Sequence, residues 1–305
     1  METVGKVTLN YQYYSGNDAY SDGSIEDELL DIVKNHTKEE YDTIIKEKKS
    51  WPILYHLSDI RENILNWFPF EKDASVLEIG AGCGAISGVL ARSVGCVTAV
   101  DLSKRRSLIN AYKNAECDNL SIIVGDFNVI SAKLEEKYDY ITLIGVLEYA
   151  GCYIQDANAA DLFLQRIKSL LKPEGKIIIA IENRLGMKYF AGCAEDHVGR
   201  MFEGIEGYPN TKGIRTYSKK EISTLLSNNG FSESKFYYPY PDYKLPNVIF
   251  SDERLPQKGE LKNNLRNYDT HRLMLFDEQR AFDSILDAGL FDEFSNSFLI
   301  VASGK

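Results

Sequence analysis

Short apolar runs that alternate with helical stretches constrain the fold of this chain more than any other feature of its sequence. The runs lie between residues 75 and 181, and each has the length of a buried strand: Val76–Ile79, Val97–Val100, Ser121–Val124, Tyr140–Ile144 and Lys176–Ile181. Strands that alternate with helices along a chain usually pair in parallel, because each helix crosses back over the sheet. The sequence therefore predicts an α/β fold with a doubly wound, mostly parallel sheet.

Two more strands and a capped helix are expected nearer the C-terminus. Lys235–Tyr238 and Phe298–Ala302 have the composition of strands. A helix is expected over residues 218–229, because Ser218 and Glu221 have the spacing of a capping box. These elements would complete the sheet and cover one side of it.

The spacing of apolar residues divides the chain into two parts. Residues 1–70 begin with a polar stretch and continue with helical spacing, so they predict a helical N-terminal cap. Residues 71–305 predict the α/β domain, with insertions at 183–217 and 241–296. Insertions of this length in a compact domain usually form lids or binding elements, so we expect them to cover a substrate.

Composition indicates an ordinary folded protein. Of its 305 residues, 44% are hydrophobic and 26% are charged, which argues against a collagen, a disordered tail or a membrane channel. No apolar run approaches the ~18 residues of a membrane span. The polar N-terminus lacks the pattern of a secretory signal. We therefore expect a cytoplasmic protein without a membrane span.

Charge and cysteine content limit the kinds of binding partner, compartment and metal site to be expected. The formal net charge of −10 opposes non-specific capture of phosphate backbones, so nucleic acid is not an expected partner. The five cysteines are an odd number without metal or redox spacing, which fits a reducing compartment. A zinc site is not expected.

The stretch from Val76 to Gly84 is the most informative about chemistry, because a strand runs there into a glycine-rich turn and then a helix. Glycine at positions 80, 82 and 84 permits positive φ angles and lets a ligand approach the backbone. About twenty residues later, Asp101 ends the second strand, where a carboxylate can bind both ribose hydroxyls. Together these residues predict a nucleoside-binding unit.

Two cofactors fit this unit, a dinucleotide and S-adenosylmethionine. Gly80, Gly82 and Ala85 also satisfy the dinucleotide fingerprint. Glu78 discriminates between them, because a carboxylate two residues before the first glycine would repel a pyrophosphate. The same carboxylate suits the ammonium and sulfonium groups of S-adenosylmethionine. Glu78 thus favours the methyl donor.

The end of the third strand supports the same choice. Asp126 can accept the adenine amino group there while Phe127 lies against the ring. A dinucleotide fold does not require this acid. An NAD(P)-dependent oxidoreductase remains the alternative, in which Arg105 and Arg106 would bind a 2′-phosphate.

Residues 75–181 resemble the class I S-adenosylmethionine-dependent methyltransferases in the order and spacing of these motifs. The resemblance implies a Rossmann-like, seven-stranded sheet with an antiparallel last strand. It also implies S-adenosylmethionine as cofactor and S-adenosylhomocysteine as product. The cofactor residues that it implies are Gly80, Ala81, Gly82 and Gly84 at the methionine and ribose, Asp101 and Leu102 at the ribose, Asp126 and Phe127 at the adenine, and Val146 and Leu147 beneath the cofactor.

Three further motifs resemble a narrower bacterial set that accompanies, or is fused to, glycosyltransferases of cell-surface glycan synthesis. The motifs are Tyr55–Ser58 with Arg61–Asn63, Glu182–Gly186 with Lys188–Phe190, and Tyr238–Lys244. The resemblance implies a glycan-linked acceptor and a glycosyltransferase as partner. Arg61 would pair with the carboxylate of the donor, with a salt bridge on a helix surface as the alternative, and Tyr55 is a further candidate cofactor residue.

Methyl transfer from a sulfonium is an in-line displacement, so the protein mainly aligns the reactants and excludes water. A hydroxyl acceptor also loses a proton. His197, which follows Glu195 and Asp196, is the first candidate base, and His271 is the second. A structural histidine is the alternative. The run of three consecutive residues does not converge as a helical i, i+4 pair would, so we expect no metal.

The acceptor would lie at the carboxyl ends of the strands, where open α/β sheets bind ligands. Glu148 and Tyr149 follow the fourth strand and Asn183 follows the fifth, so Glu148 is a further catalytic candidate and the other two are substrate candidates. An aromatic segment with three tyrosines that could stack on a sugar supplies the remaining candidates, with insertion core as the alternative: Tyr238, Tyr240 and Tyr243.

The segment after the fourth strand lacks the Asn/Asp-Pro-Pro-aromatic clamp of methyltransferases that act on base amines. This absence and the acidic net charge disfavour modification of DNA or RNA. With the resemblance to the set that accompanies glycan synthesis, we expect O-methylation of a sugar, a glycan precursor or another small-molecule hydroxyl. The alternatives are the oxidoreductase and a non-catalytic module that binds S-adenosylmethionine in glycan assembly.

Overall fold

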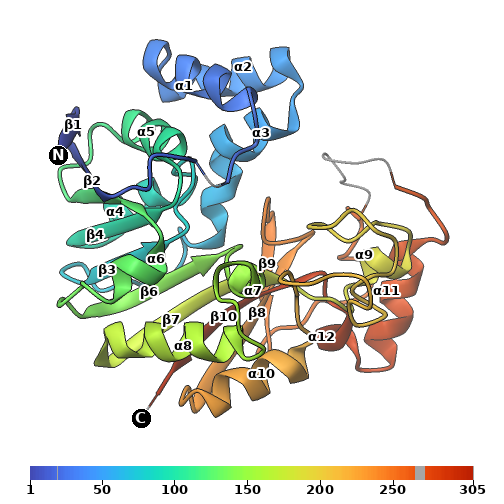
Figure 1. Ribbon diagram of the computed structural model, residues 1–305. Coiled ribbons are helices and arrows are strands. Elements are labelled where there is room, and N and C mark those ends of the chain that lie inside the picture. Colours follow the sequence, from blue (N-terminus) through green and yellow to red (C-terminus); the bar gives the residue numbers. More distant parts are fainter. Residues whose placement is uncertain (19, 265–271, 305) are drawn as a thin grey trace. The chain divides into compact units, whose positions relative to one another are not determined.

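The structure is a computed structural model that describes residues 1–18, 20–264 and 272–304 (Figure 1). The chain forms two compact units. Unit 1 comprises Met1–Leu143 and Leu170–Gly175, and unit 2 comprises Ile144–Ser169 and Lys176–Lys305.

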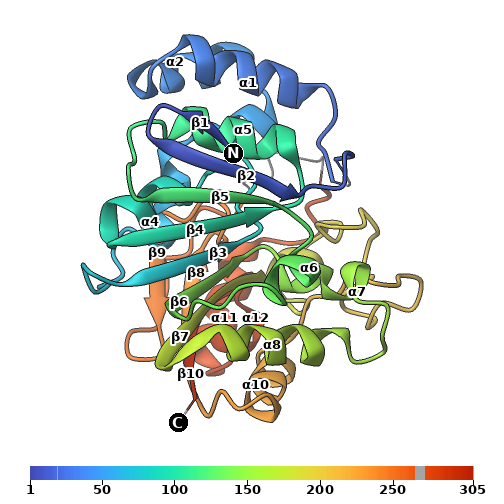
Figure 2. The same ribbon diagram turned by 60° about the vertical axis from the view of Figure 1, so that its left-hand side comes forward.

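Unit 1 is built on a mostly parallel sheet whose strands lie side by side in the order β1-β2-β5-β4-β3-β6 (Figure 2). Only β1 and β2 are antiparallel neighbours in this order. In the register of the central strands, Glu78 lies opposite Ala99 and Thr142. The strands are β1 (Glu2–Val4), β2 (Val7–Tyr13), β3 (Ser75–Ile79), β4 (Cys96–Asp101), β5 (Leu120–Gly125) and β6 (Tyr138–Ile144).

The N-terminal strands differ from the helical cap expected over residues 1–70. β2 pairs in parallel with β5, with Thr8 opposite Ser121. Val7 and Leu9 are fully buried while Thr8 between them is exposed, which is the alternation of a half-buried strand. Because only two apolar residues carry this alternation, the polar composition of the segment concealed it.

The rest of the expected cap is helical. Helices α1, α2 and α3 pack through Leu29, Ile44 and Ile53 into a cluster that also contains Cys83 and Ile109. The elements of unit 1 are α1 (Ile25–Asn35), η1 (Lys38–Glu40), α2 (Tyr41–Lys48), α3 (Trp51–Leu57), η2 (Asp59–Ile64), α4 (Ser87–Ser93), α5 (Lys104–Lys113) and α6 (Phe127–Ser131).

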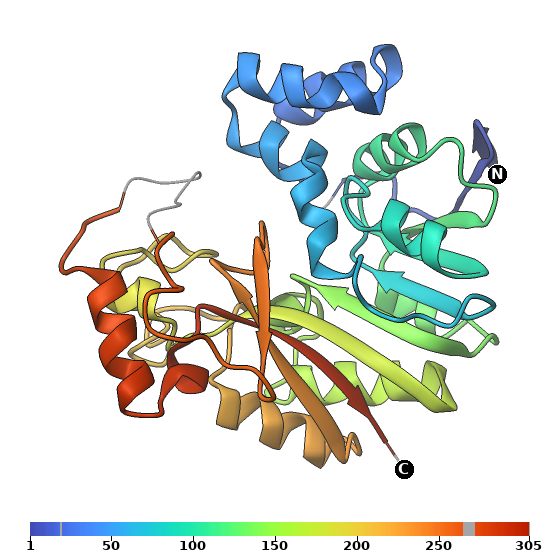
Figure 3. The same cartoon turned by 180° about the vertical axis from the view of Figure 1, so that it is seen from behind.

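Unit 2 contains strands in the order β7-β10-β8-β9, with every neighbouring pair antiparallel. The strands are β7 (Leu171–Glu182), β8 (Glu233–Tyr240), β9 (Val248–Ser251) and β10 (Ser297–Ser303), and Figure 3 shows β10 in dark red. The antiparallel last strand is thereby confirmed, but the expected number of seven strands is wrong, because β1, β2 and β9 bring the described strands to ten. The fully buried side chains of Ile177, Ile179 and Ile181 anchor β7 in the core.

The helices of unit 2 include the one expected over residues 218–229. Its capping box is confirmed, because the Ser218 hydroxyl accepts a hydrogen bond from Glu221 N and the Glu221 carboxylate accepts one from Ser218 N. The elements are η3 (Leu147–Tyr149), α7 (Ala150–Tyr153), α8 (Ala159–Leu170), α9 (Met187–Phe190), α10 (Lys219–Asn228), α11 (Glu278–Asp287) and α12 (Phe291–Phe294). Across the described ranges, no helix has both the length and the apolar character needed to cross a bilayer.

Candidate functional site

The glycine turn, residues 80–84, joins β3 to the segment before α4. Gly80, Gly82 and Gly84 have φ values of 71°, 53° and 75°, which confirms the left-handed backbone predicted for them. The amides of Gly80 and Ala81 donate to Val100 O at 2.8 and 3.1 Å. The turn is therefore fixed against the end of β4, and of its three glycines Gly80 is exposed while Gly82 and Gly84 are buried.

Asp101 ends β4 and contacts the glycine turn directly. Its Oδ2 accepts a hydrogen bond from Gly82 N at 2.8 Å, and its Oδ1 accepts one from Ser103 N at 2.9 Å. An ionised carboxylate has about four lone-pair sites, so these two bonds leave capacity for further donors such as ribose hydroxyls. The structure brings Asp101 and Gly82 together as the sequence predicted.

Glu78 lies in the interior at the end of β3. Its side chain accepts a hydrogen bond from the Ser87 hydroxyl at 2.5 Å, and that hydroxyl accepts one from Asn110 Nδ2 at 2.8 Å. Burial, together with the charge of Asp101, raises the pKa of Glu78 to about 8, although the hydrogen bond from Ser87 opposes the rise. Glu78 therefore holds a proton at neutral pH unless a cation faces it.

Arg106, on α5, lies beside the glycine turn. A Cβ at Gly82 would approach its guanidinium to 3.2 Å. The guanidinium forms ion pairs with Asp22 at 3.9 Å and Glu26 at 3.8 Å, and it stacks over the Tyr20 ring. Because these carboxylates already balance its charge, the structure weakens the alternative in which Arg106 binds a 2′-phosphate.

The other residues predicted around the cofactor fall into both units. Arg61, on η2, is buried with its guanidinium 4.1 Å from the centre of the Tyr55 ring. Asp126 caps α6 by accepting a hydrogen bond from Asn128 N at 2.8 Å, and Phe127 is buried in the first turn of that helix. Leu102 is partly exposed, and Val146 and Leu147 belong to unit 2, where Leu147 is fully buried.

Unit 2 contains a buried group of three glutamates and one histidine, which we call the His197 cluster: Glu148, Glu182, Glu195 and His197. The Nε2 atom of His197 lies 3.3 Å from Glu148 Oε1 and 3.6 Å from Glu182 Oε2. Its Nδ1 lies 3.0 Å from Glu195 Oε1. These four side chains are at most 5% exposed, although they come from η3, the end of β7 and the first insertion. The structure therefore brings Glu148 and His197 together, as candidates for one site.

Glu195 is held rigidly inside this cluster. Its Oε2 accepts hydrogen bonds from the amides of His197 and Val198, both at 2.8 Å, and its Oε1 accepts one from the Tyr208 hydroxyl at 3.1 Å. Burial favours the neutral acid, but the hydrogen bonds from His197 and the backbone hold the pKa of Glu195 below its ordinary value. Glu195 is thus an anion that fixes the orientation of the imidazole.

The pKa of His197 depends strongly on the carboxylates around it. Burial lowers its pKa, but the surrounding carboxylates outweigh burial and raise the pKa well above the ordinary value. The side chain therefore does not resemble a freely titrating base. The Tyr149 ring packs edge-on against it, with ring centres 5.4 Å apart.

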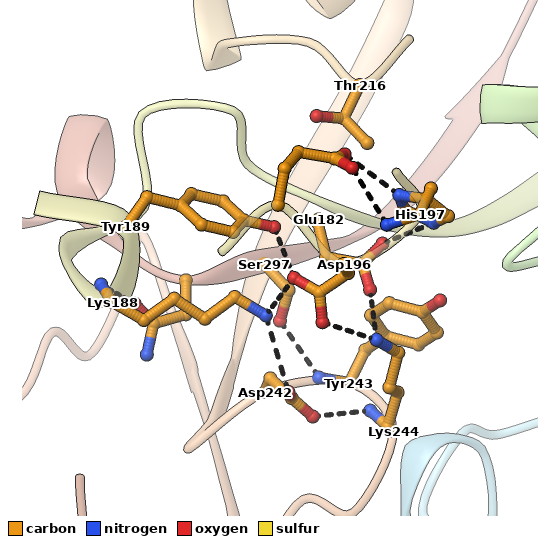
Figure 4. A network of polar contacts seen from close by, with 12 residues as sticks. Glu182, Lys188, Tyr189, Asp196, His197, Thr216, Asp242, Tyr243, Lys244 and Ser297 are labelled. Carbon is orange, nitrogen blue, oxygen red and sulfur yellow. Dashed lines mark hydrogen bonds and ion pairs between the residues drawn. The ribbon is translucent and has the colours of Figure 1, made fainter. Parts of the chain in front are cut away.

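Two lysines and two aspartates border the cluster (Figure 4). Asp196 accepts from Lys188 Nζ at 2.8 Å and from Lys244 Nζ at 2.6 Å. Lys188 also lies 3.6 Å from Asp242, and Lys244 lies 2.7 Å from Glu182 Oε1. Sequence reasoning did not assign roles to these groups. A signal was present, because the motifs around Glu182 and around Asp242 that carry the narrower resemblance meet here.

Three predicted substrate residues pack into the fold instead of facing a ligand, and one predicted catalytic residue lies outside the residues that the structure describes. The Asn183 amide donates to Glu293 O and Ser295 O at 2.8 Å, so it fixes the backbone instead of facing a ligand. Tyr238 is buried and bonded to Asp252, and the Tyr240 hydroxyl donates to Asn264, so both belong to the core of the insertion. His271 lies outside the described residues.

Tyr243 is also buried, but it stays near the cluster. Its backbone amide donates to the Ser297 hydroxyl at 2.9 Å. A Cβ at Gly145 would approach the Tyr243 hydroxyl to 2.8 Å. The open aromatic platform expected for the three tyrosines is therefore replaced by packing inside unit 2.

Comparison with known proteins adds independent findings. A family model described as a methyltransferase domain matches residues 70–230. A ubiquinone biosynthesis O-methyltransferase from Actinobacillus pleuropneumoniae is 34% identical over 115 residues, which are 36% of this chain and 46% of that protein. The chain thus spans about half the length of the first curated relatives that it matches.

A more distant relative covers more of the sequence. Ribosomal RNA small subunit methyltransferase A from Borreliella afzelii is 23% identical over 236 residues, which are 76% of this chain and 79% of that protein. Among solved structures, a SAM-dependent methyltransferase from Thermotoga maritima is 16% identical, with a TM-score of 0.45 over 88% of this chain and 100% of its own.

Proposed function

Because this chain belongs to the family of methyltransferase domains, whose cofactor is S-adenosylmethionine, we propose that it methylates a hydroxyl group of a sugar, a glycan precursor or another small molecule. The observation that carries the proposal is the glycine turn of unit 1, where Asp101 binds Gly82 and the buried Glu78 lies beneath. The turn supplies a close backbone approach, and the two acids supply sites for hydroxyls and for a cation.

The residues of unit 1 fit this cofactor. When bound, S-adenosylmethionine supplies an electrophilic methyl group on a sulfonium. A side chain at Gly84 would overlap Asn110, so this position must stay a glycine for the turn to keep its path. We assign Asp101 to the ribose, Glu78 to the ammonium group and Arg61 to the carboxylate of the donor.

The remaining assignments concern the adenine and the acceptor. We assign Asp126 and Phe127 to the adenine, and Val146 and Leu147 to a wall beneath the cofactor. For the acceptor we assign the His197 cluster with Tyr149, because a buried group of charged side chains suits a polar substrate better than an apolar one. The association with glycan synthesis, and a glycosyltransferase as partner, rest on the motifs that include Lys188 and Lys244.

A ligand panel tests the donor assignment. Thermal shift and calorimetry would compare S-adenosylmethionine, S-adenosylhomocysteine, NAD and NADP on the full chain. A ligand at 100 times its Kd adds about 2.7 kcal/mol, and each kcal/mol raises Tm by roughly 2–4 °C in a chain of this size. We expect stabilisation by the first two ligands, whereas stabilisation by NAD or NADP alone would refute the proposal.

Two substitutions locate the donor on the glycine turn. Gly82→Arg should fill the turn and Asp101→Ala should remove the ribose contact, so both should weaken donor binding at least tenfold. Asp118→Ala, which changes a surface carboxylate with an 80% exposed side chain, is the matched control. Wild-type affinity in both variants would contradict the assignment.

The acceptor class needs a transfer assay. Purified chain with S-adenosylmethionine labelled in its methyl group would be incubated with sugars, sugar nucleotides and small alcohols, and with amines as the competing class. Label recovered as a methyl ether supports the proposal. Label on amines alone would contradict O-methylation, and tight donor binding without transfer to any acceptor would favour a non-catalytic module.

A further inference from the structure

We propose that His197, Glu148 and Glu182 form a binding site for a divalent metal ion, with Glu195 orienting the histidine. The sequence argued against a metal because Glu195, Asp196 and His197 are consecutive. The structure draws its potential ligands from three separate segments instead: η3, the end of β7 and the first insertion. The ligand atoms that these residues offer all lie within 4.8 Å of one another.

The spacing of these atoms suits direct coordination. Ligands about 2.0–2.2 Å from a metal ion lie roughly 3–3.5 Å apart in tetrahedral or octahedral geometry. His197 Nε2 lies 3.3 Å from Glu148 Oε1 and 3.6 Å from Glu182 Oε2. An ion could therefore replace the Nε2 proton with little movement of the three side chains.

Glu195 prepares the imidazole for this role. Its Oε1 lies 3.0 Å from His197 Nδ1 and is itself held by the Tyr208 hydroxyl. A proton on Nδ1, directed at this carboxylate, leaves the Nε2 lone pair for an ion. Metal-binding histidines almost always have such a partner on the second ring nitrogen, and its loss typically weakens metal binding 10–100-fold.

The buried carboxylate oxygens give a second, independent observation. Within the part of the chain that the structure describes, the oxygens of Glu148 and the Oε2 of Glu182 are buried without a hydrogen bond of ordinary geometry, and Glu148 Oε1 and Glu182 Oε2 face His197 Nε2 at 3.3 and 3.6 Å. Leaving buried anionic oxygens without donors is costly. Lys244 pairs with Glu182 Oε1, on the other oxygen of that carboxylate. The oxygens that face His197 Nε2 are therefore those that the proposed ion would bind.

The local charge favours a divalent ion. Three carboxylates, those of Glu148, Glu182 and Glu195, surround a single imidazole. The neighbouring lysines and aspartates balance one another, two against two. With a neutral imidazole and a divalent ion, the net charge of the cluster would be −1. One imidazole with two carboxylates suits Zn²⁺ or Mn²⁺ better than Ca²⁺, which prefers more oxygen ligands.

Metal titration of the full chain tests the site directly. Chain dialysed against EDTA would be titrated with MnCl₂ and ZnCl₂ by calorimetry, with CaCl₂ as the comparison, and free Mn²⁺ would be counted by electron paramagnetic resonance. We expect one Mn²⁺ or Zn²⁺ per chain. Glu148→Gln, Glu182→Gln and His197→Gln should each weaken binding at least tenfold, because each removes a ligand.

Controls separate this site from other carboxylates and from misfolding. His36→Gln changes an exposed histidine paired with Glu40, so it should bind metal as the wild type does. Glu195→Gln removes no ligand and should weaken binding about 10–100-fold. Near-ultraviolet circular dichroism and the Kd for S-adenosylhomocysteine would report whether each variant is folded.

Two outcomes would overturn the proposal. No binding by the wild type at millimolar MnCl₂ or ZnCl₂ would show that His197 is simply a buried imidazolium. Unchanged binding in all three ligand variants would place the ion elsewhere. Because the readout is metal affinity, either failure leaves the donor assignment in unit 1 untouched, and failure of the donor assignment leaves this test intact.

Discussion

Replacing Glu78 with glutamine removes a buried acid whose protonation couples stability to pH. The Glu78 side chain is 4% exposed, and burial raises its pKa from 4.5 to about 8. A group whose pKa is higher in the folded state stabilises fully below its unfolded pKa, and that contribution is lost as the pH rises through the folded value. Wild-type stability should therefore fall between pH 5 and 8.

The expected size follows from the same shift. Each pH unit between the two pKa values changes the free energy of unfolding by about 1.4 kcal/mol, and because the curve flattens near each pKa the loss from pH 5 to pH 8 is about 3.5 kcal/mol. Glu78→Gln keeps the shape and the hydrogen-bonding capacity toward Ser87 but does not titrate. Its stability should therefore lack this decline.

Urea unfolding at pH 5, 6, 7 and 8 and constant ionic strength measures the effect as the difference between wild type and variant. Taking the difference removes the other titrating groups, which both proteins share. Glu47→Gln, at an exposed position on α2, is the control and should follow the wild-type curve. Parallel curves for wild type and Glu78→Gln would refute the reasoning, because they would mean that Glu78 titrates like a solvated acid.

Other predictions concern positions in unit 1. Gly84→Ala should destabilise on the order of 1–3 kcal/mol in urea unfolding, because a Cβ there would overlap Asn110 at a φ of 75°. Gly16 has a φ of 92°, but a Cβ there would meet no atom within 4 Å, so Gly16→Ala is the control. If Gly16→Ala destabilised as much as Gly84→Ala, the overlap with Asn110 would not be the cause. His56 is hydrogen-bonded to Asp22, and burial lowers its pKa to about 4. Wild-type stability should therefore rise between pH 4 and 6.5, whereas His56→Gln should lack this rise; an equal rise in both would contradict a buried neutral imidazole.

The donor residues could be predicted from sequence because their requirements are local. A strand that turns into a glycine-rich segment needs positive φ at fixed positions, and Gly80, Gly82 and Gly84 have it. Asp101 lies beside the turn because neighbouring parallel strands end at the same edge of the sheet. In these cases the chain order itself sets the geometry.

The His197 cluster could not be predicted in the same way, because tertiary packing brings its members together. Glu195 and Asp196 are adjacent in sequence but turn to different partners, one to the His197 imidazole and the other to Lys188 and Lys244. Neither pattern nor spacing indicates such a divergence. The prediction that three tyrosines face a substrate was wrong for a related reason. An aromatic strand end has the same sequence pattern whether it packs into a core or faces a ligand.

The cost of burying the His197 cluster argues that it serves binding. Replacing a buried ion pair with well-packed apolar side chains is often neutral or stabilising, so stability alone gives little reason to keep one. Two of its four members, Glu195 and His197, lie on the first insertion, and the buried core of β7 is formed by isoleucines and not by these charges. Strongly perturbed groups of this kind concentrate at functional sites. Charge that is costly to bury, half of it supplied by an insertion that the sheet does not require, is therefore better explained by a ligand that it holds than by the fold that carries it.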